Sequence, residues 1–173
     1  MPLNVVGKAH EARATPDFTW FVYGSSLDCA AFAEWAESHG YAVPDFTRAR
    51  PARLPGYRLS FDVNSRHWGG AVASLAEAAG QAVEGLAVPM PGAARGLVDH
   101  KEGAISGLYE PLEVTLTGAD GKPVPALAYR AAAGRRLAAD APASPGYLDV
   151  LISGAKACGL SAEWVARLEK LRG

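Results

Sequence analysis

The sequence predicts an α+β fold in which helices pack around a mostly antiparallel sheet or small barrel. Three observations carry this prediction. An aromatic and β-branched run at residues 18–23 turns through glycine and serine into a helical pattern. Several short alternating runs follow, and the last two flank an Asp-Gly dipeptide. Two amphipathic helical patterns then close the chain, an order of elements that is typical of an α+β domain.

The composition limits the possible classes of function. The chain has 173 residues, of which 49% are hydrophobic and 20% charged, as expected for one globular domain. We expect residues 1–16 to form a loose lead-in and residues 17–173 to form the domain. A formal charge of -1 gives no general attraction to nucleic acid. No apolar run approaches the roughly 20 residues of a membrane span, and the first residues lack a secretory signal, so we expect a cytoplasmic protein.

The cysteine and histidine patterns give no metal motif. Cys29 and Cys158 lie far apart in the sequence, in helical patterns, and we interpret them as two small buried thiols in a reducing compartment. The four histidines are scattered. His100 lies beside Asp99 and Glu102, but no second group of ligands accompanies them. We therefore expect no metal site.

The first strand and the helix after it meet at Gly24. Backbone N–H groups at the start of that helix suit a carboxylate or another anion. Either Ser26 or Asp28 can cap the helix, and Gly40 is a plausible C-terminal cap. Four residues at helical spacing define its inward stripe: Phe32, Trp35, Ala36 and His39.

The middle of the chain reads as short strands separated by turns. Pro55-Gly56 predicts a turn before an alternating strand at residues 57–61. The elements expected next are strands at residues 71–75 and 81–88, a short helix at 94–102 and a connection at 104–109.

The end of the chain carries the clearest local signals. Asp120-Gly121 lies between alternating runs at residues 112–116 and 124–129, which predicts a hairpin. Ser144-Pro145 starts the next helix, with proline at its first position, and Ser161 caps the last helix. The apolar face of the last helix comprises Trp164, Val165, Leu168 and Leu171.

Carboxylates are the candidates for chemistry because the sequence has no phosphate loop and no GxSxG elbow. Glu102 precedes Gly103, and a helix that breaks at glycine can hold its last side chain over a cavity. If Leu108 and Tyr109 desolvate this carboxylate, its proton affinity rises toward the working pH. The residues alone leave open that Glu102 is a surface residue beside Lys101.

An ordered series of short motifs resembles the γ-glutamylcyclotransferase family. Tyr23-Gly24-Ser25-Ser26-Leu27 is similar to the substrate loop Tyr-Gly-Ser-Asn-Leu of that family. The series continues with Arg66-His67-Trp68-Gly69-Gly70, Gly85, Glu102-Gly103, Ser106-Gly107-Leu108-Tyr109, Ser144-Pro145-Gly146-Tyr147, Gly154-Ala155-Lys156 and Gly159-Leu160. Each motif is short, but the ordered set covers nearly the whole chain.

The resemblance implies a fold, an activity and a site. The fold would be a small mixed, mostly antiparallel β-barrel with flanking helices, with no metal or organic cofactor, as a monomer or homodimer. The activity would release 5-oxoproline from a small γ-glutamyl amino acid or amine by intramolecular cyclisation. The catalytic glutamate of the family falls on Glu102, which would serve as general base and then general acid. The substrate-binding positions fall on Tyr23, Gly24, Ser25, Ser26, Leu27, Tyr109, Tyr129 and Tyr147.

Ser26 departs from the family pattern, which has asparagine at this place. Serine is shorter and offers one donor, so a substrate contact is lost or taken over by water. Two alternatives therefore stay open. The chain could bind a γ-glutamyl-like molecule without turnover, or use the same pocket for amide hydrolysis or acyl transfer.

Overall fold

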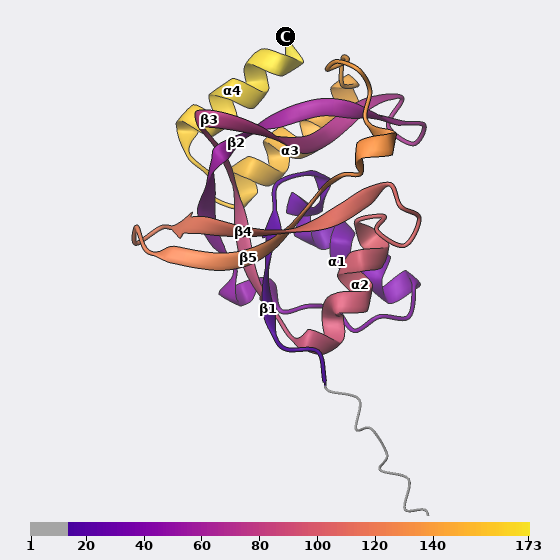
Figure 1. The fold of residues 1–173 in the computed structure, drawn as a ribbon, viewed down its shortest axis with the longest axis vertical. Helices are drawn as coiled ribbons and strands as arrows, with labels where there is room; N and C mark the ends of the chain where they lie inside the picture. The colour runs from indigo at the N-terminus through magenta and orange to yellow at the C-terminus, as the bar shows by residue number, and fades with distance from the viewer. Residues whose placement is uncertain (1–13) are drawn as a thin grey trace, which may run out of the picture.

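The computed structural model describes residues 14–173 as a closed five-stranded barrel with helices packed against it (Figure 1). Residues 1–13 of the expected lead-in lie outside the described residues. The strands are β1 (Phe18–Val22), β2 (Arg50–Ser65), β3 (Gly70–Met90), β4 (Tyr109–Gly118) and β5 (Pro123–Ala131).

The strands follow one another around the barrel in the order β1-β3-β2-β4-β5. All neighbouring pairs are antiparallel except the closing pair of β1 and β5, which is parallel and joined at Trp20 and Leu127. The predicted α+β fold, a small mixed and mostly antiparallel barrel with flanking helices, is therefore confirmed.

Two predicted interruptions of the sheet are wrong. Pro55-Gly56 is not a turn, because β2 continues through it with a register irregularity between Pro55 and Tyr57. Gly56 has a φ of +82°, which lets the strand bend without reversing. The separate strands expected at residues 71–75 and 81–88 are likewise one long strand, β3, with Gly80 at φ +79° beside the same irregularity. The glycines bend the two longest strands, which helps the sheet curve into a barrel.

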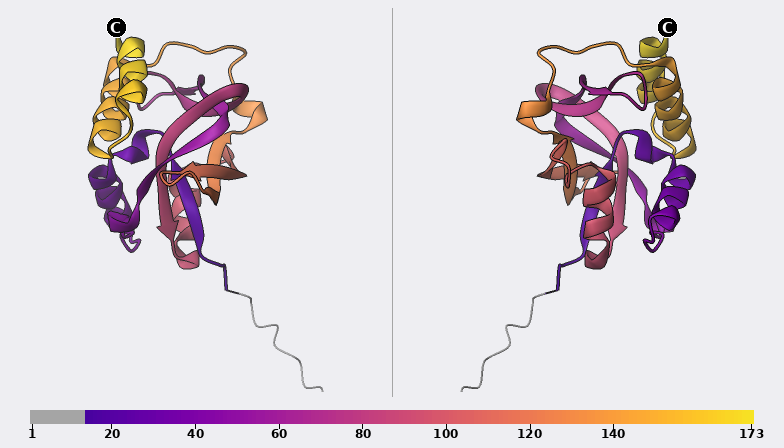
Figure 2. Two further views of the ribbon diagram at one scale, coloured as in Figure 1. Left: turned by 90° about the vertical axis from the view of Figure 1, so that its left-hand side faces the viewer. Right: turned by 90° about the vertical axis from the view of Figure 1, so that its right-hand side faces the viewer.

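The helices are α1 (Cys29–Ser38), α2 (Arg95–Lys101), α3 (Pro145–Ala157) and α4 (Ala162–Arg172). Helices α1, α3 and α4 begin at predicted capping residues. Asp28 caps α1 by accepting from Ala31 N at 3.0 Å, while Ser144 and Ser161 cap α3 and α4. Helices α1, α3 and α4 lie along one side of the barrel (Figure 2).

The core is built outward from β1. Trp20, Phe21 and Val22 are all nearly inaccessible to solvent. The ring of Trp20 packs against Phe32 of α1, with centroids 5.2 Å apart. Burial of large aromatic side chains of this kind contributes about 2 to 3 kcal/mol each. The core therefore fixes the end of β1, from which the candidate substrate loop departs.

Two residues predicted to face inward are exposed. His39 lies just beyond the last turn of α1, where its ring stacks on Trp35 at 4.1 Å and Nδ1 lies 2.8 Å from the carbonyl oxygen of Trp35. A polar partner at the end of the helix therefore replaces the expected core contact. Leu171 is 54% exposed because it lies at the free end of the last helix.

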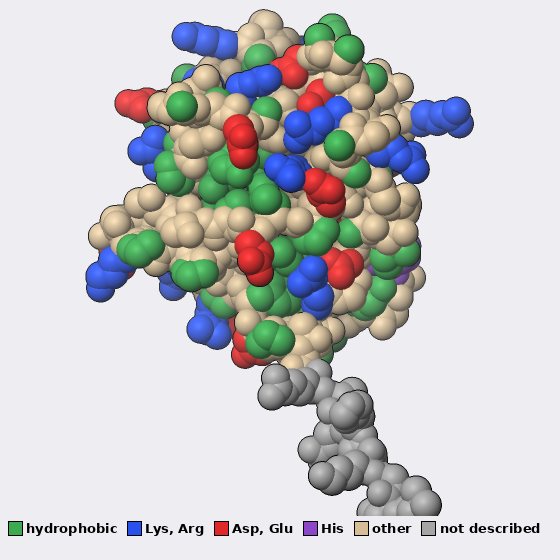
Figure 3. Space-filling view, in the orientation of Figure 1, with side chains coloured by type: hydrophobic (Ala, Val, Ile, Leu, Met, Phe, Trp, Pro, Cys, Tyr) green, Lys and Arg blue, Asp and Glu red, His purple; other side chains and the backbone are tan. Residues whose placement is uncertain are grey.

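The face of the molecule drawn in Figure 3 shows no concentration of one charge. In the view of Figure 3, acidic and basic side chains are interspersed over the visible face. No helix in residues 14–173 has both the length and the apolar character that crossing a membrane requires.

Candidate active site

A cavity of about 390 Å³ lies where several segments of the chain meet. They include the turn η1 (Ser25–Leu27), the end of β2, the start of β3, the end of α2, the start of β4 and the start of α3. Eight predicted site residues line it: Tyr23, Gly24, Ser25, Ser26, Glu102, Tyr109, Tyr129 and Tyr147. The structure thus brings together residues that are spread over more than a hundred positions of sequence.

Leu27 is the one predicted site residue that does not line the cavity. Its side chain is buried and packs against α3. At Gly154 an added Cβ would lie 2.7 Å from Leu27 Cβ, so only glycine allows the helix to approach this closely. Leu27 therefore anchors the loop to the protein, whereas its neighbours face the cavity.

The turn after β1 uses the backbone amides of Leu27 and Asp28 for its own hydrogen bonds, but not those of Ser25 and Ser26. Leu27 N donates to Gly24 O at 3.0 Å and Asp28 N donates to Ser25 O at 3.1 Å. Within the described part of the chain, the amides of Ser25 and Ser26 donate to no other group. They are thus available as donors for an anionic or carbonyl oxygen in the cavity.

Tyr109 and Tyr147 both bind the backbone of Ala73, but in opposite senses. The hydroxyl of Tyr109 donates to Ala73 O at 2.8 Å. The hydroxyl of Tyr147 accepts from Ala73 N at 2.9 Å. Tyr147 therefore keeps its own proton for donation, whereas Tyr109 has committed its proton and can only accept from a further partner.

Tyr23 and Tyr129 form a second pair, and in this pair both hydroxyls donate their protons to protein groups. The Tyr23 hydroxyl donates to Tyr129 O at 2.5 Å, and the Tyr129 hydroxyl donates to the carboxylate of Asp99. The same carboxylate oxygen accepts from Arg95 Nε at 3.0 Å. Asp99 was considered at sequence level only as a neighbour of His100, and no local pattern links it to a tyrosine 30 positions away.

Glu102 ends α2 as its C-cap residue, and its amide donates to Val98 O at 2.9 Å. Gly103 follows with a φ of +72°, which turns the chain away and leaves the glutamate at the cavity. The residue is half-buried, and desolvation raises the pKa of its carboxyl group to about 7. The positive charge of Lys101 opposes this shift but does not cancel it.

Lys101, next to Glu102, also lines the cavity. Its Nζ lies 4.9 Å from the centre of the Trp35 ring, and burial lowers its pKa. Burial raises the pKa values of Tyr23, Tyr109, Tyr129 and Tyr147, so these phenols stay protonated at neutral pH. Among the lining groups with a shifted pKa, Glu102 is the one placed to exchange a proton near pH 7.

The tip of the β2–β3 hairpin adds residues to the cavity that were not predicted as site residues. Arg66 and Trp68 line it, and the Trp68 ring lies 5.3 Å from that of Tyr147. The glycine pair after Trp68 allows a close approach of backbone. A Cβ at Gly70 would lie 2.9 Å from Ser144 N, at the start of α3.

The two cysteines, which were expected to be small buried thiols, are neighbours in space. Both are half-buried at the junction of η1, α1 and α3. The sulfur of Cys158 lies 3.4 Å from Leu27 O, and a hydrogen bond from the Cys158 thiol lowers the pKa of Cys29 to about 7. Helical periodicity gives no information about contact between residues so distant in sequence.

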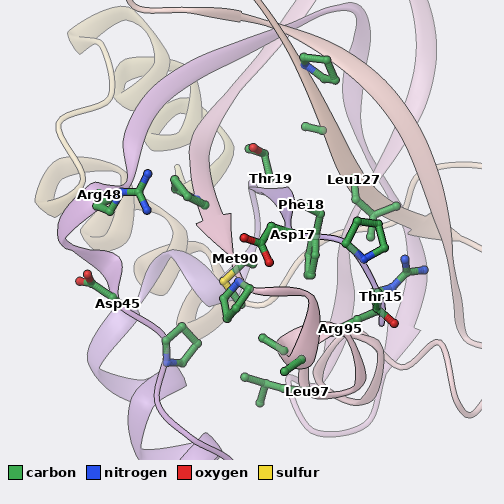
Figure 4. Close-up of a pocket in the computed structure, with 18 of the residues that line it drawn as sticks. Thr15, Asp17, Phe18, Thr19, Asp45, Arg48, Met90, Arg95, Leu97 and Leu127 are labelled. Carbon is green, nitrogen blue, oxygen red and sulfur yellow. The ribbon is translucent and has the colours of Figure 1, made fainter. Parts of the chain in front are cut away.

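A larger cavity, of about 1240 Å³, opens at the base of the barrel (Figure 4). Its polar side chains are largely engaged with protein groups. Asp17 accepts from Gly92 N at 3.0 Å, Asp45 accepts from the amide of Thr47 at 2.9 Å, and Arg95 binds Asp99. It contains none of the predicted site residues, so the smaller cavity is the candidate active site.

Neither cavity has the ligand set of a metal centre. Within residues 14–173 no three histidine, cysteine or acidic side chains gather in a way that would hold a metal ion.

Known proteins are similar to this chain in both sequence and fold. A family model described as the AIG2-like family matches residues 82–168. The gamma-glutamylcyclotransferase of Bos taurus is 30% identical over 158 residues, which cover 89% of this chain and 78% of the bovine protein. A solved structure named gamma-glutamyl cyclotransferase is 27% identical with a TM-score of 0.72, over 88% of this chain and 86% of its own. An uncharacterized protein of Homo sapiens is 28% identical with a TM-score of 0.71, over the same shares.

The sequence identity extends over most of both chains, and the barrel architecture is shared. The chain therefore belongs to the γ-glutamylcyclotransferase family.

Proposed function

We propose that the protein is a γ-glutamylcyclotransferase that converts a γ-glutamyl amino acid or γ-glutamyl amine into 5-oxoproline and a free amine. The observation that carries the proposal is Glu102, a carboxyl group with a pKa of about 7 in a cavity of about 390 Å³. Such a group takes up and releases a proton readily at neutral pH. Family membership supports the reaction class.

The hydrogen-bonding groups of the cavity suit the amino-acid end of a γ-glutamyl compound. The hydroxyls of Tyr23 and Tyr109 donate their protons to backbone carbonyl groups, so toward a substrate they can only accept hydrogen bonds. Ionised Glu102 is likewise an acceptor only. These acceptors suit the α-ammonium group. The amides of Ser25 and Ser26 are donors and suit the α-carboxylate.

The reaction needs no protein nucleophile. The α-amine of the substrate attacks its own γ-carbonyl carbon, which forms the lactam C–N bond, and the bond to the departing amine breaks. Because the nucleophile is tethered, holding the substrate in its folded shape supplies several kcal/mol of the barrier. Glu102 carries two protons in succession: one that the α-ammonium loses before the attack, and one that the same nitrogen loses after the C–N bond has formed. Both pass to the nitrogen of the departing amine, which leaves as an ammonium ion. The proton count balances without water.

Tyr147 is the donor placed to stabilise the oxyanion. Its hydroxyl accepts from Ala73 N and so directs its own proton elsewhere. Gly24 leaves this hydroxyl accessible, because a Cβ there would lie 3.7 Å from the Tyr147 oxygen. A fixed donor directed at the position of the oxyanion stabilises developing negative charge more than it stabilises the ground-state carbonyl.

The test is 5-oxoproline release from γ-glutamyl-alanine and from lysine carrying a γ-glutamyl group on its side chain. We expect Glu102→Gln to lower kcat/KM by about 10²- to 10⁴-fold. Its matched control, Glu113→Gln, changes an exposed glutamate on β4 and should leave kcat/KM unchanged. In the wild type, kcat/KM should rise with pH through about 7, because the base must be ionised.

Other products would point to other functions. Free glutamate in place of 5-oxoproline would identify a hydrolase. Thermal stabilisation by the γ-glutamyl compound without any product would identify a binding protein, an alternative that Ser26 motivates. Full activity in Glu102→Gln would contradict the assigned proton transfer.

A further inference from the structure

We propose that Tyr129 and Asp99 are positioning residues, which hold the helix bearing Glu102 at a fixed distance from the substrate loop. The inference rests on the proposed function and extends it to two residues that do not take part in the chemistry. It assigns the hydroxyl of Tyr129 to the protein framework and not to the substrate.

The contacts form a continuous chain across three elements. Tyr23, at the start of the substrate loop, donates through its hydroxyl to the backbone oxygen of Tyr129 on β5. The side chain of Tyr129 then donates to Asp99 of α2. Tyr129 thus binds the loop through its backbone and the helix through its hydroxyl, so one residue links the two halves of the cavity.

Asp99 also contacts residues before and after Glu102 in the sequence. Its carboxylate binds Arg95 one turn earlier at 3.0 Å. Its backbone oxygen accepts from Ala104 N at 2.9 Å, beyond the glutamate. Glu102 therefore lies within a closed loop of contacts that begins and ends at Asp99.

Helix α2 depends on such contacts because its own stabilisation is weak. It has only seven residues, and no side chain caps its N-terminus. Isolated helices of this length are unstable in water, so tertiary contacts hold them in place. The orientation of Glu102 consequently follows from where Tyr129 and Arg95 hold Asp99.

The protonation of Tyr129 agrees with a role in the framework. The residue is 1% exposed, and burial together with the hydrogen bond to Asp99 raises its pKa. The phenol therefore keeps its proton and keeps donating it to the carboxylate. This bond has a charged acceptor and is stronger than a bond between neutral groups.

The test compares Tyr129→Phe with Tyr41→Phe. Each variant removes one tyrosine hydroxyl that contacts α2: that of Tyr129 binds Asp99, and that of Tyr41 lies 3.0 Å from His100 Nδ1. We expect Tyr129→Phe to lower kcat by about ten- to a hundred-fold, with KM nearly unchanged, since small displacements of a catalytic group have effects of this size. Tyr41→Phe should retain wild-type kcat. Asp99→Asn keeps an oxygen acceptor for Tyr129 but weakens the bond to Arg95, and should show an intermediate loss.

A second readout separates positioning from loss of folding. We expect the pKa of Glu102, followed by NMR of labelled glutamate side chains, to fall toward the ordinary range in Tyr129→Phe, because a loosened turn admits water. The other charged and titratable groups of the cavity are unchanged in this variant: Lys101, Arg66, Tyr23, Tyr109 and Tyr147.

The outcomes distinguish the two proposals. A lower thermal midpoint in Tyr129→Phe with kcat and the Glu102 pKa unchanged would overturn the positioning role. If the wild type forms no 5-oxoproline, the proposed function fails, and the NMR comparison of the two variants still decides whether Tyr129 fixes Glu102.

Discussion

Among single residues, Ala73 decides which of two tyrosines can donate a hydrogen bond to a substrate. Its carbonyl oxygen takes the proton of Tyr109, while its amide leaves the proton of Tyr147 free. Two chemically identical side chains on one backbone unit are therefore not equivalent toward a substrate. The difference could not be read from sequence, because both tyrosines are equally compatible with an apolar position in the core.

We expect Tyr147→Phe to lower kcat by about 10²- to 10³-fold, the usual effect of removing one oxyanion donor. Tyr109→Phe is its matched partner, since it also removes one hydroxyl bound to Ala73, and should lower kcat much less. Each change removes one buried hydrogen bond, at about 1 to 3 kcal/mol of stability. Steady-state kinetics and thermal unfolding check the pair. Equal losses of kcat would contradict the assignment of Tyr147 as the donor.

Among the contacts between secondary-structure elements, the one between α3 and the substrate loop determines where the loop lies. Gly154 allows the helix to pack directly on Leu27, and the thiol of Cys158 reaches Leu27 O from the same helix. Helix α3 therefore holds the loop at Leu27, while Gly24, Ser25 and Ser26 line the cavity.

Gly154→Ala should displace this loop. The new methyl group would lie 2.7 Å from Leu27 Cβ, so either α3 or the loop must move. We expect KM to rise several-fold and stability to fall by about 1 to 3 kcal/mol, as for other overpacked sites. Gly146→Ala, on the same helix, meets nothing within 4 Å and serves as the control. An unchanged KM in Gly154→Ala would show that the loop tolerates the displacement.

Helix caps and the Asp-Gly hairpin were predictable because their chemistry is local: Ser144 bonds to an amide three positions on. The turn predicted at Pro55-Gly56 was wrong because the same dipeptide is compatible with a turn and with a β-bulge. Only the pairing of β2 with β3 decides between the two. The substrate loop and Glu102 could be identified through resemblance. Asp99 could not, because its partner Tyr129 lies on another element and no sequence period connects them.

The ionisation of Glu102 affects the whole molecule. Its pKa of about 7 in the folded protein exceeds the ordinary value of 4.5. Between these pH values the folded protein binds a proton that the unfolded chain releases. The contribution of Glu102 to stability is therefore complete below about pH 4.5 and is lost as pH rises through about 7.

We expect Glu102→Gln to gain stability relative to the wild type as pH rises, because glutamine does not ionise. At about 1.4 kcal/mol per pH unit, the difference between the two variants should grow on the order of 3 kcal/mol between pH 4.5 and 8. Urea unfolding of both proteins at several pH values measures it. A flat difference for Glu102→Gln would mean that the carboxyl group is not desolvated.

The parallel pairing of Trp20 with Leu127 closes the barrel between two segments roughly a hundred positions apart. Joining such distant segments in a free chain carries a large loss of entropy. The hairpins β2–β3 and β4–β5 form from neighbouring sequence, and they reduce that separation to a short path through paired strands. From this topology we expect barrel closure to be a late event in folding. Because the substrate loop leaves β1 directly after this seam, the binding site is complete only when the last strand pair has formed.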